Sequence, residues 1–257
     1  MKFLILILIL SLASCTKPSY PKEKLAQSVE SIVNRECKLE SHAALVGKTF
    51  YLKVSLPGLV SSETNIKKEV LEKLQKVHLA ITRVSLSSDA KIEYLVTIVE
   101  LPGWETHFSI TQRLDDLKWY FYQKISRGDF EDRIIYDIGL KDAAETEIFR
   151  DINLREFVAR LIVSKFNWLT VSNPFVSAAV GARLKIDSLS GNRLVLKTDA
   201  ESLSDMSIEF MRATIMEWGA KIARKYRFFE FSEISIINNR GRQVISIPIE
   251  QTEIPLK

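Results

Sequence analysis

Apolar residues recur along this chain with two different spacings, and the spacings predict alternating helices and strands. A stripe at helical spacing in residues 22–37 predicts a helix, and its members are Leu25, Val29, Ile32 and Val33. Residues 49–56 instead alternate between apolar and polar side chains, which is typical of a strand with one buried face. The same criteria predict helices at 65–78 and 109–126, and strands at 80–86, 91–101 and 130–138.

The predicted order from residue 49 to residue 138 is strand, helix, strand, strand, helix, strand. This βαββαβ order is that of the ferredoxin-like split βαβ arrangement, which hosts many functions and therefore implies none. Helices at 142–151 and 153–166 follow, and Asn153 with Glu156 is spaced as a capping pair for the second of them. We therefore expect an α/β domain over residues 22–167.

A second, smaller domain is expected over residues 182–257. Residues 168–181 lack a period and contain Asn173-Pro174, so they are expected to form a linker. The expected order beyond it is ββαββ. It comprises a hairpin at 183–187 and 193–198, a long helix at 205–226, and a second hairpin at 233–237 and 242–247. This order predicts a small antiparallel sheet with one covering helix, whose buried stripe would be Ile208, Met211, Ile215, Trp218 and Ile222. The fold class of the whole chain is thus α+β.

The N-terminus carries a pattern of another kind. Lys2 precedes Phe3–Leu12, an apolar run that has the length of a signal-peptide core and is too short to span a bilayer. The run ends in Leu12-Ala13-Ser14-Cys15, which resembles the lipobox of bacterial lipoproteins. The resemblance implies removal of residues 1–14, acylation of Cys15, and a short lipidated tether at 15–21. Thr16, where an Asp often marks inner-membrane retention, favours the outer membrane facing the periplasm.

Composition and charge limit the classes of partner. Hydrophobic residues make up 46% of the chain and charged residues 26%, as in ordinary globular proteins. The formal net charge of +4 falls by one when Lys2 leaves with the signal, which is too little to indicate nucleic-acid binding. With Cys15 acylated, Cys37 has no thiol partner in the chain. We expect it to be a buried small hydrophobe.

Residue patterns for catalysis or metal binding are not evident. His42, His78 and His107 stand outside any metal-binding spacing, and no nucleophile elbow or phosphate-binding loop occurs. Ser188–Gly191 is better explained as a hairpin turn. The acidic residues Asp115, Asp116, Glu131, Asp132, Glu145, Glu147 and Glu156 are better explained as helix-terminal and surface charges. We therefore name no catalytic residue, no metal and no cofactor.

Two groups of residues are candidate binding surfaces. The first is aromatic and comprises Trp119, Tyr120, Phe121 and Tyr122, with Trp104 upstream. A helix cannot bury four successive large rings on one face, so either protein covers both sides, which we favour, or some rings are exposed for binding. The second group is basic and comprises Lys221, Arg224, Lys225, Arg227, Arg240 and Arg242. These residues either complement a helix dipole or contact anionic headgroups or a cell-wall polymer.

The leading functional hypothesis is a non-enzymatic binding or scaffold module. It would be held to the membrane by the lipid on Cys15 and would bind other envelope proteins or polymers. Two alternatives remain open from the sequence. One is a cell-envelope hydrolase with a site assembled from unremarkable residues, and the other is a carrier of a small apolar ligand. Converging polar groups would favour the hydrolase, and an apolar cavity would favour the carrier.

Overall fold

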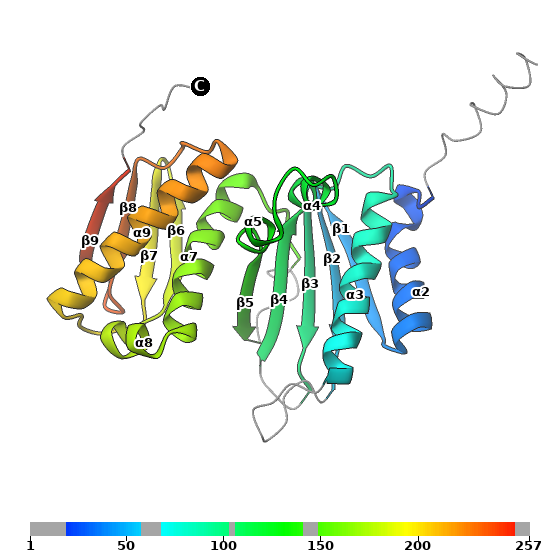
Figure 1. Cartoon of the computed structure of the whole chain (residues 1–257), viewed down its shortest axis with the longest axis horizontal. Helices are drawn as coiled ribbons and strands as arrows, with labels where there is room; N and C mark the ends of the chain where they lie inside the picture. Colours follow the sequence, from blue (N-terminus) through cyan, green and yellow to red (C-terminus); the bar gives the residue numbers. More distant parts are fainter. Residues whose placement is uncertain (1–18, 58–67, 103–105, 141–148, 250–257) are drawn as a thin grey trace, which may run out of the picture. The chain divides into compact units, whose positions relative to one another are not determined.

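The chain forms two compact units, which meet in sequence between Asp151 and Ile152. A computed structural model describes residues 19–57, 68–102, 106–140 and 149–249 (Figure 1). Each unit consists of one sheet with helices packed on it, so the expected α+β class is confirmed.

The first unit is built on a five-stranded sheet. Its elements are α2 (Leu25–Cys37), β1 (Ser41–Val46), β2 (Thr49–Ser55), α3 (Lys68–Leu86), β3 (Tyr94–Glu100), β4 (Thr106–Arg113), α4 (Leu114–Phe121), α5 (Arg127–Glu131) and β5 (Ile135–Leu140), after a short 3-10 turn, η2 (Lys22–Lys24). The strands lie in chain order; β2 and β3 are parallel, and the other pairs are antiparallel. Helices α2 and α3 lie side by side on one face of the sheet (Figure 1).

The strand order differs from the split βαβ arrangement expected from the sequence. In a split arrangement another strand separates the parallel pair, whereas β2 pairs directly with β3. Two errors in the predicted elements cancel, so the predicted order of strands and helices still matches most of the observed order. Residues 80–86 continue α3, because Ala80, Ile81 and Val84 extend the buried helical stripe. Strand β4 replaces the start of the helix expected at 109–126, and β1 was not predicted.

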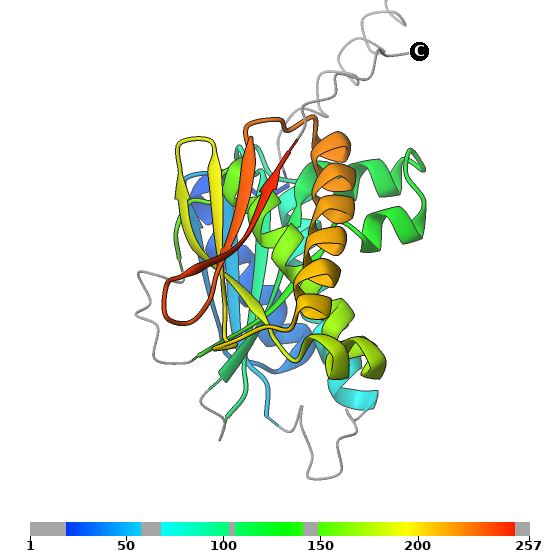
Figure 2. The same cartoon turned by 90° about the vertical axis from the view of Figure 1, so that its left-hand side faces the viewer.

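The second unit is a four-stranded sheet covered on one face. Its elements are α7 (Leu154–Ser172), α8 (Pro174–Val180), β6 (Leu184–Ser190), β7 (Arg193–Thr198), α9 (Asp205–Tyr226), β8 (Glu233–Ile237) and β9 (Gln243–Pro248). The expected ββαββ order is confirmed. The sheet is mixed rather than antiparallel, because α9 connects the parallel neighbours β7 and β8. Figure 2 shows α9 lying along one face of this sheet.

The stretch expected as a linker, residues 168–181, is helical. Helix α7 continues to Ser172, and the side chain of Asn173 then accepts hydrogen bonds from the amides of Phe175 and Val176 at the start of α8. Pro174 is compatible with this geometry because the first helical position needs no amide donor. Since α7 packs on α9 and β6, the boundary between the units lies before α7 and not after it.

The buried stripe of α9 omits the tryptophan that the sequence assigned to it. Trp218 is only half-buried, and Lys221 places its Nζ 4.2 Å from the centre of the indole ring. The neighbouring Gly219 approaches the sheet instead: a Cβ there would lie 3.7 Å from Cδ1 of Ile234. The expectation that Trp218 packs against the sheet is therefore wrong.

The two units repeat one arrangement of helix, hairpin, crossover helix and hairpin. In each first hairpin a two-residue turn begins with a glycine of positive φ, namely Gly47 (φ 56) and Gly191 (φ 53). The backbone carbonyl of the second turn residue accepts a hydrogen bond from the amide of the residue just before the next strand of the module, β3 or β8. Glu93 N donates to Lys48 O at 2.8 Å, and Ser232 N donates to Asn192 O at 2.9 Å.

The repeat extends to the last hairpin of each unit. Leu114 N donates to Glu93 O, and Ile249 N donates to Ser232 O, both at 2.9 Å. The matching registers place Thr49 and Tyr94 of the first unit where the second unit has Arg193 and Glu233. In the first unit β5 is added beyond this shared module, on the outer edge of β4.

Candidate functional site

Helix α4 carries the aromatic run, and most of that run faces solvent. Trp119, Phe121 and Tyr122 are 36%, 53% and 73% exposed, whereas Tyr120 stacks on Phe130 with ring centres 4.8 Å apart. The favoured prediction, that protein covers both sides of the run, is therefore wrong. Trp104, the upstream member of the predicted surface, lies outside the described residues.

The end of α4 is fixed by a compact helix-terminating turn. Gln123 has a φ of 56°, and its amide donates to Tyr120 O at 3.0 Å. The amide of Lys124 donates to Trp119 O at 2.8 Å, so the last carbonyls of the helix are satisfied. The exposed rings thus sit on a hydrogen-bonded turn that sets their direction.

A buried ion-pair cluster holds α4 to α5 beneath these rings. The guanidinium of Arg133 binds Asp116 Oδ1 and Asp129 Oδ2, each at 2.9 Å. The side chains of Arg133 and Asp116 are only 7% and 1% exposed. The same guanidinium lies 5.6 Å from the centre of the Trp119 ring. Because a buried charge without its partner is costly, the cluster fixes the position of α4.

The six basic residues predicted as one patch lie at opposite ends of α9. The C-terminal end carries Lys221, Arg224, Lys225 and Arg227. Arg240, however, binds Glu201 Oε2 at 2.9 Å, and Glu201 precedes the N-terminus of α9; Arg242 lies on the same turn. Since 22 helical residues span about 33 Å, the prediction of a single basic patch is wrong.

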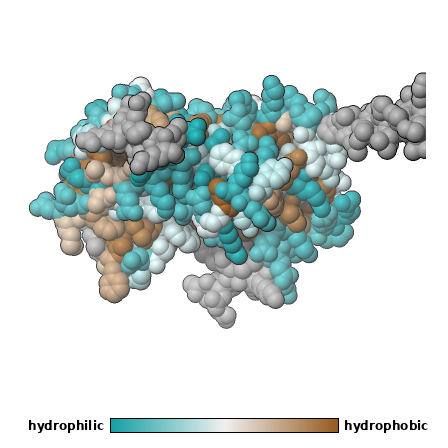
Figure 3. Space-filling view, turned by 45° about the horizontal axis from the view of Figure 1, so that its top comes forward, coloured by the Kyte–Doolittle hydropathy of each residue, from teal (hydrophilic) through white to brown (hydrophobic). Residues whose placement is uncertain are grey.

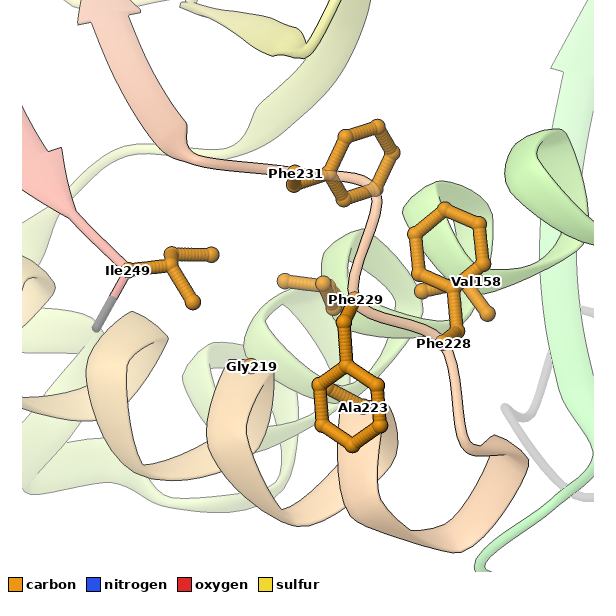
Figure 4. Close-up of a pocket in the computed structure, with 8 residues that line it drawn as sticks. Val158, Gly219, Ala223, Phe228, Phe229, Phe231 and Ile249 are labelled. Atoms are coloured by element: carbon orange, nitrogen blue, oxygen red, sulfur yellow. The ribbon is translucent and has the colours of Figure 1, made fainter. Parts of the chain in front are cut away.

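An apolar hollow lies beside the C-terminal end of α9 (Figure 4). It is lined by Val158 of α7, Gly219 and Ala223 of α9, and Phe228, Phe229 and Phe231 of the following segment. Its volume of about 10 Å³ is close to the space that one water molecule needs. Ligand pockets commonly exceed ~300 Å³, so this hollow gives no support to the alternative of a small-molecule carrier.

The histidines and the free thiol are distributed over the first unit. His42 is exposed, with Nδ1 3.6 Å from Glu30, whereas His78 lies against the Thr97 hydroxyl and burial lowers its pKa. Among the described residues no group of His, Cys, Asp and Glu side chains is arranged to hold a metal ion. Cys37 is buried and burial raises the pKa of its thiol, as expected for an inert small hydrophobe.

Several of the acidic residues considered for catalysis are in ion pairs. Asp115 pairs with Lys118 at 3.2 Å and Glu131 pairs with Arg127 at 2.7 Å. The amide of Glu156 donates to Asn153 Oδ1, which confirms the predicted cap of α7. Ser188 to Gly191 end β6 and begin its turn, which confirms the hairpin interpretation. Glu145 and Glu147 lie outside the described residues.

Three of the four sheet edges carry features that discourage further pairing. On β1, Glu30 Oε1 accepts the outward amide of Ala43 at 2.7 Å. On β6, the side-chain amide of Asn167 binds the backbone of Leu184, and the pairing is interrupted by a bulge. On β9, a bulge and Pro248 occupy the edge. Such features protect open edges from association with other strands.

The fourth edge, β5, is regular. It pairs with β4 without a register shift, and Tyr136 and Ile138 are 41% and 67% exposed. The amide of Ile138 donates to Asp137 Oδ1, so it points away from β4. By the alternation of a strand, the amides of Tyr136 and Leu140 point the same way. We call this feature the β5 edge: the outward backbone of residues 136, 138 and 140 with the side chains of Tyr136 and Ile138.

No helix in the described part of the chain is long and apolar enough to cross a bilayer. No family model, curated protein or solved structure matches the chain. Inferences about function therefore rest on its own residues.

Proposed function

We propose that this chain is a lipid-anchored, non-enzymatic scaffold module of the bacterial cell envelope, held by Cys15 in the outer membrane and facing the periplasm. The order of Lys2, an apolar run, small residues and Cys15 supports the anchor. Only residues 16–19 separate Cys15 from Tyr20, which already pairs with Ser88 of the first unit. Its partner, in this proposal, is an extended segment of another envelope protein.

The observation that carries the binding role is the β5 edge. The outward amides and carbonyls of residues 136, 138 and 140 are spaced to pair with an added strand, as in β-strand addition to an exposed sheet edge. The added strand would displace the side chain of Asp137, a residue of β5 itself, from the amide of Ile138. The exposed Tyr136 and Ile138 lie on one face and offer apolar contacts to alternate side chains of that strand. The other three edges are blunted, which leaves β5 as the edge best suited to a partner.

Replacing Cys15 with Ser is expected to abolish lipid attachment. A serine hydroxyl does not replace the cysteine thiol, which the lipobox resemblance implies as the acceptor of a diacylglyceryl group. Cells expressing Cys15→Ser or the unchanged chain would be labelled with a radioactive fatty acid, and the purified chains compared. Cys37→Ser is the matched control and should keep full label. Equal label in the Cys15→Ser chain would contradict the anchor.

A photocrosslinking residue at Tyr136 is expected to capture a protein partner in intact cells. Ile138→Pro removes an outward amide, which an edge strand tolerates, and should abolish the crosslink. Ile138→Ala keeps the amide and should retain it. The same crosslinker at Leu79, 56% exposed on α3, measures background. Crosslinks that match those at Leu79, or that survive Ile138→Pro, would contradict strand addition.

A further inference from the structure

The tether enters the fold at one end of the first unit. Tyr20 bridges to Ser88, and its amide donates to Ser87 O at 3.3 Å. The amide of Lys22 donates to Asp89 Oδ1 at 2.8 Å. Residues 20–22 are therefore attached to the loop between α3 and β3. The five steps from Cys15 to Tyr20 span at most about 17 Å, so this end cannot lie far from the acyl chains.

Helix α4 starts at the same end of the sheet. Tyr94, which follows the α3–β3 loop, pairs with Arg113 at the end of β4. Leu114, the first residue of α4, donates its amide to Glu93 O in that loop at 2.9 Å. In Figure 1 α4 and the N-terminal end of α2 both lie at the upper end of the first sheet. A short tether thus brings α4 close to the membrane surface.

The exposed surface of α4 has the chemistry of a membrane interface. Trp119 and Tyr122 combine an apolar ring with one polar group, the kind of side chain that sits at the headgroup level of a bilayer, and Phe121 adds an apolar ring. Figure 3 brings this end forward, and pale and brown surface interrupts the teal hydrophilic surface there. Of the neighbouring charges, Lys118 pairs with Asp115 and Arg127 with Glu131, whereas Lys124 follows the rings directly. We expect contact by the rings to depend mainly on their own apolar surface rather than on anionic lipid.

We propose that Trp119, Phe121 and Tyr122 insert into the lipid interface beside the acylated Cys15, so that the first unit rests on the membrane through α4. This inference rests on the proposed lipid anchor. The buried Arg133 cluster and the turn at Gln123 hold the three rings in position for that contact. Insertion would orient the first unit as well as tether it.

Quenching of tryptophan fluorescence by brominated lipid tests the proposal. The acylated full chain would be reconstituted into phosphatidylcholine vesicles with and without bromine on the acyl chains, and flotation would be measured on the same samples. Most of the quenching is expected to disappear in Trp119→Phe and to remain in Trp168→Phe. Trp168 is the matched control because it is 62% exposed in the second unit. Adding anionic lipid should leave the quenching unchanged.

The outcomes separate the anchor from the insertion. A chain that floats with the vesicles but keeps its quenching in Trp119→Phe, or shows none, would keep the anchor and overturn the insertion. A chain that does not float would overturn both. A second variant, Phe121→Asp with Tyr122→Asp, places two exposed charges in the surface without touching the buried cluster. It should lose Trp119 quenching and still float. Unchanged quenching would mean that Phe121 and Tyr122 do not insert, which would overturn the proposal that the three rings enter the lipid interface together.

Discussion

Phe157→Ala is expected to lower the free energy of unfolding of the second unit by about 3–5 kcal/mol, because it leaves a cavity between α7 and α9. Phe157 is fully buried, and its ring contacts the ring edge of Tyr226 with centres 5.5 Å apart. A loss of that size is a large part of the ~5–15 kcal/mol that stabilises a typical domain. Amide hydrogen exchange, read peptide by peptide, would show faster exchange across β6–β9.

The same measurement tests where the two units divide. The sequence predicted a first domain over residues 22–167, which would contain most of α7. In that case Phe157→Ala would speed exchange in β2 and β3 instead. Phe50→Ala is the reciprocal control, because Phe50 is fully buried beneath α2 and α3. Faster exchange of both sheets in either variant would show that the units share one cooperative core.

Arg133→Met is expected to destabilise the first unit by roughly 3–5 kcal/mol, since it removes the guanidinium partner of a buried carboxylate. Asp116 is 1% exposed and loses a partner at 2.9 Å, whereas Asp129, 28% exposed, retains access to water. Methionine keeps much of the volume of the aliphatic part of arginine. The loss of stability would therefore be due to the missing charge and not to a cavity. Urea unfolding with hydrogen exchange at β3 and β4 would measure it.

Two companion variants make that prediction specific. Arg127→Met removes an exposed partner of Glu131 on the same short helix and should cost far less than Arg133→Met, because water screens exposed ion pairs. Asp116→Leu in the Arg133→Met background should recover much of the lost stability, because apolar residues replace a buried ion pair well. Equal stability of the single and double variants would mean that water already solvates Asp116.

The sequence predicted elements best where one face is apolar and buried. Helices α2 and α9 are examples, because their apolar positions repeat with a clear period. Strand β2 was also found from its alternation, although Tyr51 on its expected polar face is buried as well. Strand β4 was missed because Ser109, Thr111 and Gln112 are polar yet buried, so its alternation does not separate apolar from polar. Strand order also depends on pairings between distant residues, which local periodicity does not encode.

For the candidate surfaces, too, the sequence identified residues that are neighbours along the chain but not contacts between distant residues. The sequence identified the aromatic run on α4, but exposure depends on whether another layer covers it. The prediction of one basic patch was wrong because Arg240 forms an ion pair with Glu201, near the N-terminal end of α9. The distance between these two residues along the sequence does not reveal this contact. The β5 edge was not identifiable, because its openness is a comparison among four strand edges. No single residue signals it.

The repeated module creates a hazard during folding, since two tandem units of one topology can exchange strands. Divergence of the matched positions works against that exchange. Tyr94 and Thr49 are fully buried in the first unit, whereas their counterparts in the second are charged. Glu233 is held ionised by Ser235, Ser246 and Arg193, and these contacts lower its pKa to about 2. If β8 replaced β3, that carboxylate would enter a buried tyrosine site without Ser246 of β9 and Arg193 of β7, so the hybrid sheet would be less stable and each strand would be directed to its own unit.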